Sequence, residues 1–184
     1  MTFKNKIQQL SKLEAKEKWQ EHIVLAKSLL KDDPENHVRN HWFLTRISSS
    51  YYEARQYRMA LKYAKKALDL YPNCPLALWD LAGALDTLKE PRKAIEIWKK
   101  LLRKGVEKIA FNQCGEGLRR AESLLSDCRY RIGLSYSDLG KKKLAIKYLK
   151  AHLAHRRAGL PSLYSRREIE KVLSDLLDPT SSVK

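Results

Sequence analysis

The sequence has little of the residues that build turn-rich folds. Its 184 residues include only 7 Gly and 6 Pro, which argues against a sandwich or barrel and for helices. Long hydrophobic runs are also missing, since none approaches the roughly 18 apolar residues of a membrane span. The first residues show no apolar stretch typical of a secretory signal. We therefore expect a helical chain with no membrane segment, in the cytoplasm.

Cysteine is scarce as well. Cys74, Cys114 and Cys128 are odd in number and scattered, which argues against a disulfide framework. Histidine is too sparse, and too far in sequence from cysteine, for a zinc pattern, so we expect no metal and no cofactor. No phosphate loop, dinucleotide fingerprint or nucleophile elbow is present. A reactive Cys114 is the weakest of our hypotheses, and we expect no enzyme.

Acidic residues are outnumbered. The chain carries 37 Lys and Arg against 21 Asp and Glu, a formal net charge of +16. Such a protein associates with polyanions at low salt whatever its function. Two interpretations stay open: a solvated, lysine-rich helical surface, or a surface selected for an anionic partner.

An internal repeat is present. Ala60 and Ala94 each follow a helical stretch and a short polar break and are 34 residues apart, and Ala145 follows Ala94 by 51 residues. Apolar residues recur around each alanine at the helical spacing of three and four. A single helix pair cannot bury its apolar face, but stacked pairs can. The pattern therefore predicts a helical array.

The motifs resemble the tetratricopeptide repeat (TPR) family. The best helix-turn-helix match runs from Ile132-Gly133 through Tyr136 to Gly140 and Ala145, and the best second helix runs from Tyr57 to Pro72. The resemblance covers roughly residues 41–157. Val106, His152 and Arg157 depart from the family pattern at helix ends. The resemblance implies an all-α, right-handed solenoid of helix pairs.

The expected organisation follows from these windows. It comprises a partial helical pair (1–40, with helices near 5–14 and 17–31), TPR-like repeats (41–74, 75–105 and 126–159), an insertion (106–125), a capping helix (160–178) and a tail (179–184). Asp32-Asp33-Pro34 and Asp178-Pro179 are expected helix stops. Ser165 and Glu168 have the spacing of a capping box. The insertion is expected to lengthen the first helix of the third repeat.

The resemblance implies a protein-interaction scaffold or adaptor, because in this family the first helix of each repeat lines a concave groove that receives a peptide or partner helix. Position by position, the predicted groove comprises Trp42, Thr45, Arg46, Ser49, Tyr52, Glu53, Trp79, Asp80, Gly83, Asp86, Thr87, Asp127, Tyr130, Arg131, Leu134 and Asp138. The carboxylate-binding clamp of some relatives is matched only by Arg131. Acidic Asp80 and Asp127 argue against that clamp.

Positive charge gathers late in the chain. The predicted basic patch comprises Lys141, Lys142, Lys143, Arg156, Arg157, Arg166 and Arg167. A nucleic-acid-binding module that uses this patch is the alternative function. The expected partner is another protein or peptide, with nucleic acid as the alternative, and the chain is expected to be a monomer or weak homodimer.

Overall fold

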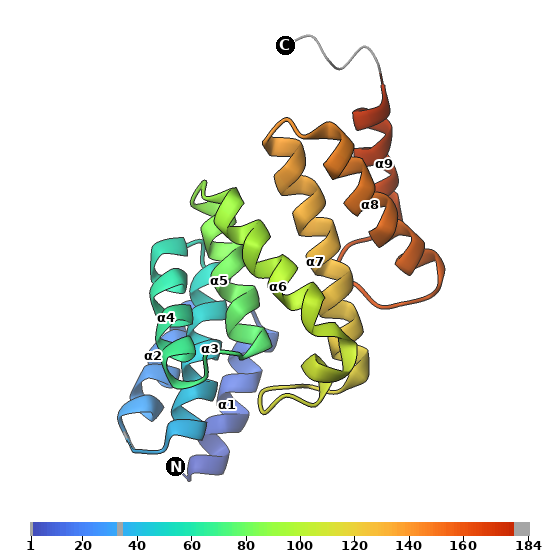
Figure 1. Cartoon of the computed structure of the whole chain (residues 1–184). Helices are drawn as coiled ribbons and strands as arrows, with labels where there is room; N and C mark the ends of the chain where they lie inside the picture. Colours follow the sequence, from blue (N-terminus) through green and yellow to red (C-terminus); the bar gives the residue numbers. More distant parts are fainter. Residues whose placement is uncertain (1, 33–34, 179–184) are drawn as a thin grey trace. The chain divides into compact units, whose positions relative to one another are not determined.

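The fold is all-α. The computed structural model describes residues 2–32 and 35–178, and in these ranges it contains nine helices and no strand. Figure 1 shows them in chain order: α1 (Phe3–Ala15), α2 (Trp19–Lys31), α3 (His37–Glu53), α4 (Tyr57–Leu70), α5 (Pro75–Thr87), α6 (Pro91–Ala110), α7 (Leu118–Asp138), α8 (Lys142–Arg157) and α9 (Arg166–Leu177). The expected tail 179–184 and the stops at Asp33, Pro34 and Pro179 lie outside the described residues.

The helices form two compact units, Met1–Lys89 and Glu90–Lys184. In the first unit α1 to α5 each pack on the next helix in the chain, and α3 also packs on α5. In the second unit α6 to α9 follow the same rule. This is the packing of a helical-repeat solenoid. The unit boundary separates α5 from α6, the two helices that the sequence assigns to one repeat.

A left-handed residue marks the turn within each helix pair. Glu17, Arg55, Lys89 and Gly140 all have φ between 54° and 68°, and each stands two positions before α2, α4, α6 or α8 begins. In three turns the next amide closes the preceding helix, as when Gln56 N–H donates to the Tyr51 carbonyl at 2.8 Å. This is a Schellman-type helix end. The same backbone turn thus recurs at spacings of 38, 34 and 51 residues.

The core of the first unit lies between α1–α2 and α3–α4. Its fully buried residues are Leu10, Ile23, Ala26, Leu29, Phe43, Ile47 and Ala60, joined by the nearly buried Tyr51. Small residues sit where the helices approach most closely: Ala60, Ala64 and Ala67 form the buried stripe of α4. The apolar period predicted from the sequence is therefore the one that packs.

The core of the second unit ends in a cap. Ile169 and Leu173 of α9 pack against Tyr130, Leu149 and Leu153 of α7 and α8. The predicted capping box is confirmed: Ser165 Oγ accepts from the Glu168 amide at 3.2 Å, and the Glu168 carboxylate accepts from the Ser165 amide at 2.6 Å. Helix α9 thus starts where the sequence predicts.

The extra residues before the third repeat lengthen two helices. Gly105, with φ of 77°, interrupts α6, which continues to Ala110, and α7 already begins at Leu118. Helix α7 spans 21 residues against 13, 17 and 13 in α1, α3 and α5. The expected long first helix of the third repeat is therefore present, and 111–117 form the short connection.

A buried lysine–tyrosine contact occurs once in each unit. Lys27 of α2 donates to the Tyr51 hydroxyl at 2.5 Å and lies 5.3 Å from the Tyr63 ring centroid. In the second unit Lys99 of α6 donates to Tyr136 at 2.7 Å and lies 5.9 Å from the Tyr148 ring. Both tyrosine pairs are 85 residues apart in sequence. Helices α2–α4 and α6–α8 are thus structural equivalents, built on the same three side chains.

Candidate functional site

The concave-side candidates of the first unit lie on α1, α3 and α5. These are the first helices of their pairs, and they run parallel because each helix reverses the direction of the one before it (Figure 1). Trp42 of α3 is 37% exposed, whereas the adjacent Phe43 is completely buried. The two rings contact edge-on at 5.2 Å. A large aromatic side chain is therefore held at the surface by one that belongs to the core.

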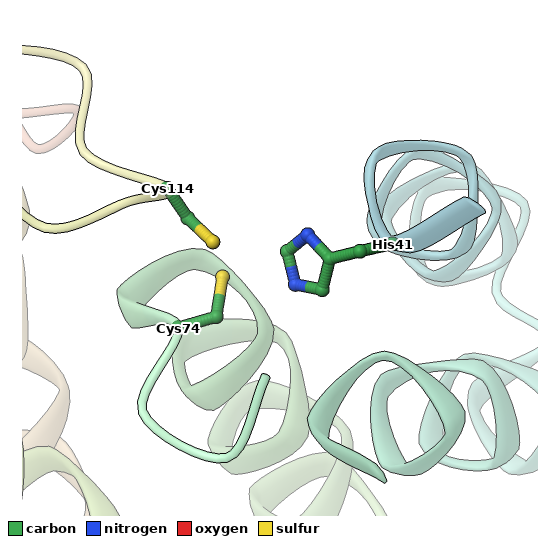
Figure 2. Close-up of side chains that lie close together, drawn as sticks. All are labelled: His41, Cys74 and Cys114. Atoms are coloured by element: carbon green, nitrogen blue, oxygen red, sulfur yellow. The ribbon is translucent and has the colours of Figure 1, made fainter. Parts of the chain in front are cut away.

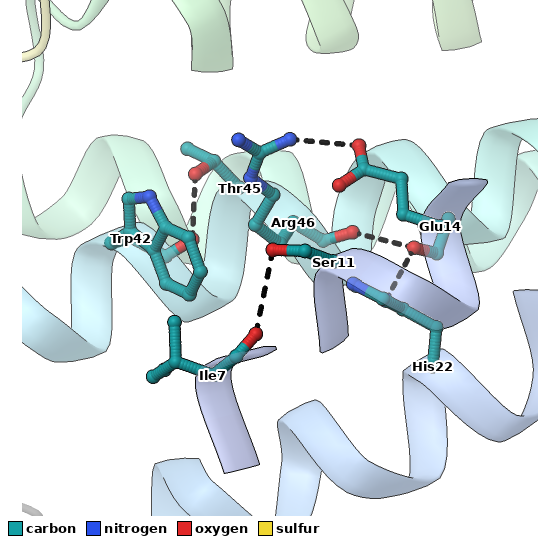
Figure 3. Close-up of polar contacts among 8 residues, drawn as sticks. Ile7, Ser11, Glu14, His22, Trp42, Thr45 and Arg46 are labelled. Atoms are coloured by element: carbon teal, nitrogen blue, oxygen red, sulfur yellow. Dashed lines mark hydrogen bonds and ion pairs between the residues drawn. The ribbon is translucent and has the colours of Figure 1, made fainter. Parts of the chain in front are cut away.

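Arg46 is held in place beside Trp42. Its guanidinium lies 5.3 Å from the Trp42 ring centroid and donates to the Glu14 carboxylate of α1 at 2.8 Å. Figure 3 shows this ion pair and the indole on the same side of the helices. One carboxylate already neutralises Arg46. The positive charge that the sequence assigns to this face is therefore occupied within the protein.

Asp80 of α5 has a perturbed carboxyl group. The residue as a whole is half-buried, but its carboxyl faces α3 and loses contact with water. Burial raises its pKa to about 7, opposed by a hydrogen bond with Ser48 and the charge of Arg46, and assisted by the nearby Glu53. Asp80 is thus partly protonated at neutral pH. The constant negative charge that argued against a carboxylate clamp here is only a partial one.

The remaining first-unit candidates frame the same side. Ser49, Tyr52, Trp79, Asp86 and Thr87 are half-buried, and Glu53 is exposed. The Tyr52 hydroxyl lies 3.4 Å from Thr87 Oγ1, and a Cβ added at Gly83 would meet the Tyr52 ring at 3.4 Å. Gly83 therefore lets Tyr52 lie flat against α5.

The second-unit candidates are placed differently. Asp127 is 2% exposed, and its carboxylate accepts hydrogen bonds from the Ser162 hydroxyl and, at 3.2 Å, from the Leu163 amide. Tyr130 is also buried and stacks on Tyr164 with ring centroids 3.9 Å apart. The α8–α9 connection covers both residues. They attach the C-terminal cap in this structure and do not face solvent.

Arg131, Leu134 and Asp138 complete the second-unit set. Arg131 is half-buried, and its guanidinium lies 5.4 Å from the ring of the fully buried Trp98. Leu134 packs against the cap cluster, and Asp138 is half-exposed within the last turn of α7. Arg131 therefore sits over a core residue of its own unit.

The predicted basic patch divides by environment. Lys141, Lys142, Lys143, Arg166 and Arg167 are exposed. Arg157 pairs with Glu170 at 3.2 Å, and the Arg156 guanidinium donates to the Leu160 carbonyl. Helix α8 contains no Asp or Glu in its 16 residues. Its exposed lysines therefore form the densest positive surface within the second unit, while Arg156 serves the α8–α9 connection.

His41 and Cys74 form a polar pair that the sequence did not suggest. Figure 2 shows them facing each other from α3 and the start of α5, with donor atoms within 4.8 Å. Cys74 is the N-cap residue of α5, and its sulfur accepts from the Ala77 amide at 3.5 Å. His41 also packs edge-on against Tyr71, and burial lowers its pKa. Within the first unit the pair offers two donors, fewer than a zinc site uses.

The family model for tetratricopeptide repeats matches residues 43–74 and 126–152. These segments cover α3–α4 and the α7–α8 pair, the helices that share the lysine–tyrosine contact. The chain contains tetratricopeptide repeats. A search of curated proteins finds no match.

Solved structures share the fold. The chain resembles MamA (22% identity, TM-score 0.58, covering 91% of this chain and 92% of that one). It also resembles the apo form of RapI (17%, 0.76), covering 96% of this chain and 63% of RapI. A Podosopora anserina kinesin light chain protein with nearly identical TPR-like repeats matches at 14% and 0.66, over 94% and 84%. At these identities the likeness shows the TPR fold alone.

Two further observations bound the site. Among the helices of 2–32 and 35–178, none combines the length and apolar character that crossing a membrane requires. Sequence reasoning missed Glu14 and Ser48, which act on Arg46 and Asp80 from positions with no family motif. The sequence signal for Glu14 would have been its stripe with Ile7 and Ser11 on α1, the side that Figure 3 shows toward Trp42.

Proposed function

We propose that the first unit is a protein-interaction module that receives a peptide or partner helix on the side formed by α1, α3 and α5. We call this side the α1/α3/α5 face, defined by Glu14, Trp42, Arg46, Ser49, Tyr52, Glu53, Trp79, Asp80 and Asp86. TPR proteins are in general protein-binding scaffolds, and repeat solenoids offer extended concave surfaces. The single observation that carries the proposal is Trp42, 37% exposed beside a fixed arginine.

The residue types fit this role. Tryptophan, tyrosine and arginine dominate the energetics of interfaces, because they combine a large apolar area with polar handles. Here Trp42 and Arg46 are held in place by Phe43 and Glu14, so they lose little freedom on binding. The face is therefore organised before a partner arrives.

The test compares capture of partners at moderate salt with nuclease present. Trp42→Ala is expected to lose the specific partner, with affinity falling roughly 10–100-fold, the scale of an interface aromatic. Phe111→Ala is the matched control, since Phe111 is 74% exposed but lies in the second unit. Equal binding by both variants, with unchanged melting temperatures, would refute this function.

Nucleic-acid binding is the second candidate, supported by the absence of acidic residues from α8. Replacing Lys141, Lys142 and Lys143 together with Ala is expected to reduce only nonspecific, salt-dependent binding if the module binds protein. Loss of the specific partner in this triple variant, with Trp42→Ala binding normally, would transfer the function to the basic surface.

A further inference from the structure

The α1/α3/α5 face is acidic in a basic protein. Its ionisable groups near Arg46 are Glu14 on α1, Glu53 on α3 and Asp80 on α5. Glu14 takes the guanidinium directly at 2.8 Å. The carboxyl groups of Glu53 and Asp80 therefore share a single positive charge that is already paired, and the cluster has room for one more cation.

We propose that this face binds a basic segment of a partner protein, with a Lys or Arg side chain placed between Asp80 and Glu53 and a neighbouring apolar side chain on Trp42. The inference deepens, and rests on, the function proposed above. An acidic segment would meet two carboxyl groups and an arginine without a free partner, so charge complementarity selects the basic one. The exposed indole of Trp42 supplies the apolar surface and an aromatic ring that also favours a nearby cation.

A cation in this position changes the protonation of Asp80. Burial and Glu53 raise the pKa of Asp80 to about 7, and an incoming positive charge lowers it again. Binding therefore releases a proton near neutral pH. If the bound state requires the carboxylate, affinity rises about ten-fold between pH 6 and pH 8. The groups that act on this carboxyl are Arg46, Ser48 and Glu53 of α3, all of which keep one charge state over that range.

The experiment uses an array of random 12-residue peptides without histidine, probed with the fluorescently labelled full chain at moderate salt. The wild-type protein is compared with Trp42→Ala, Glu53→Lys and Asp69→Lys. Glu53 and Asp69 are both exposed in the first unit, but Asp69 lies on α4, outside the α1/α3/α5 face. The two lysine variants therefore differ in where the charge is reversed and are matched in net charge.

The expected peptides carry net positive charge with an aliphatic or aromatic neighbour. They should lose at least ten-fold in affinity to Trp42→Ala and Glu53→Lys and keep it with Asp69→Lys. Calorimetry of a selected peptide in two buffers of different ionisation enthalpy should show proton release at pH 7, and Asp80→Asn should remove both the release and the pH dependence.

The outcomes separate the two proposals. Selected peptides that need Trp42 but carry net negative charge would overturn the basic-partner inference and leave the interaction function standing. Peptides that bind Trp42→Ala as well as wild type, or no selected peptides at all, would overturn both. Basic peptides that bind Glu53→Lys normally would show general charge attraction and refute the site.

Discussion

The closest helix crossing in the second unit gives a quantitative test of the packing. A Cβ added at Gly133 of α7 would stand 2.7 Å from Leu149 Cγ and 2.9 Å from Leu149 Cδ2 of α8. Leu149 is completely buried, so it cannot swing aside into solvent. Counted from the left-handed turn residues Arg55 and Gly140, the equivalents in the first unit are Ser48 and Ala64, both also completely buried. One crossing thus pairs Gly with Leu, and the other pairs Ser with Ala.

This equivalence predicts compensation. Gly133→Ser alone should destabilise the protein by about 1–3 kcal/mol through overpacking. Leu149→Ala alone should cost about 2–5 kcal/mol through the cavity it leaves. The double variant rebuilds the Ser–Ala crossing of the first unit, so its cost should fall below the sum of the two by at least about 1 kcal/mol.

The assay is denaturant unfolding followed by circular dichroism at 222 nm, with the free energy of unfolding compared at equal m-values. Gly83→Ala is the matched control, because the added Cβ meets the Tyr52 ring at an ordinary 3.4 Å and the helix gains roughly 0.5–1 kcal/mol from losing a glycine. Single costs that add within about 0.5 kcal/mol in the double variant would refute the crossing geometry.

Three further perturbations probe other parts of the molecule. Burial raises the pKa of Asp127 to about 6, so its contribution to stability is full below about pH 4 and is lost as pH rises through 6; Asp127→Asn should therefore raise stability by about 1–3 kcal/mol at pH 8 and not at pH 4, measured by thermal unfolding at both values. Arg55→Gly should not destabilise the protein and should gain up to about 1 kcal/mol by relieving a φ of 59°, whereas Gly140→Ala at the equivalent turn should lose about 1 kcal/mol, and a reversed order in chemical denaturation would contradict the turn assignment. A chain ending at Gly159 should expose Tyr130, Leu149 and Leu153 and self-associate in size-exclusion chromatography; a monomer of unchanged stability would show that α9 is no cap.

Local patterns predicted the elements well because they depend on neighbours in sequence. The helix periods, the capping box at Ser165 and the long α7 all follow from spacings of three to four residues. Burial of the candidate site depends on distant segments. Asp127 and Tyr130 occupy family groove positions, but Ser162, Leu163 and Tyr164 cover them from 35 or more residues away. No periodicity in α7 reports that coverage.

The ion pair of Arg46 shows the same limit. Glu14 is 32 residues away on a helix outside the family match, and only the register between α1 and α3 brings the two together. The groove positions of Trp42, Arg46 and Asp80 were predictable from the repeat. Their charge balance required the structure, because it depends on which carboxylate reaches the guanidinium first.

The Gly133–Leu149 and Ser48–Ala64 crossings imply that this chain could not have been enlarged, or be redesigned, by exchanging single helices. An α7 transplanted in place of α3 would bring Gly133 opposite Ala64 and leave a void, and an α3 in place of α7 would set Ser48 against Leu149. Only a whole helix pair carries its own complementary sizes. Recombination of such genes should therefore conserve the pair as the heritable module, with breakpoints in the connections between pairs.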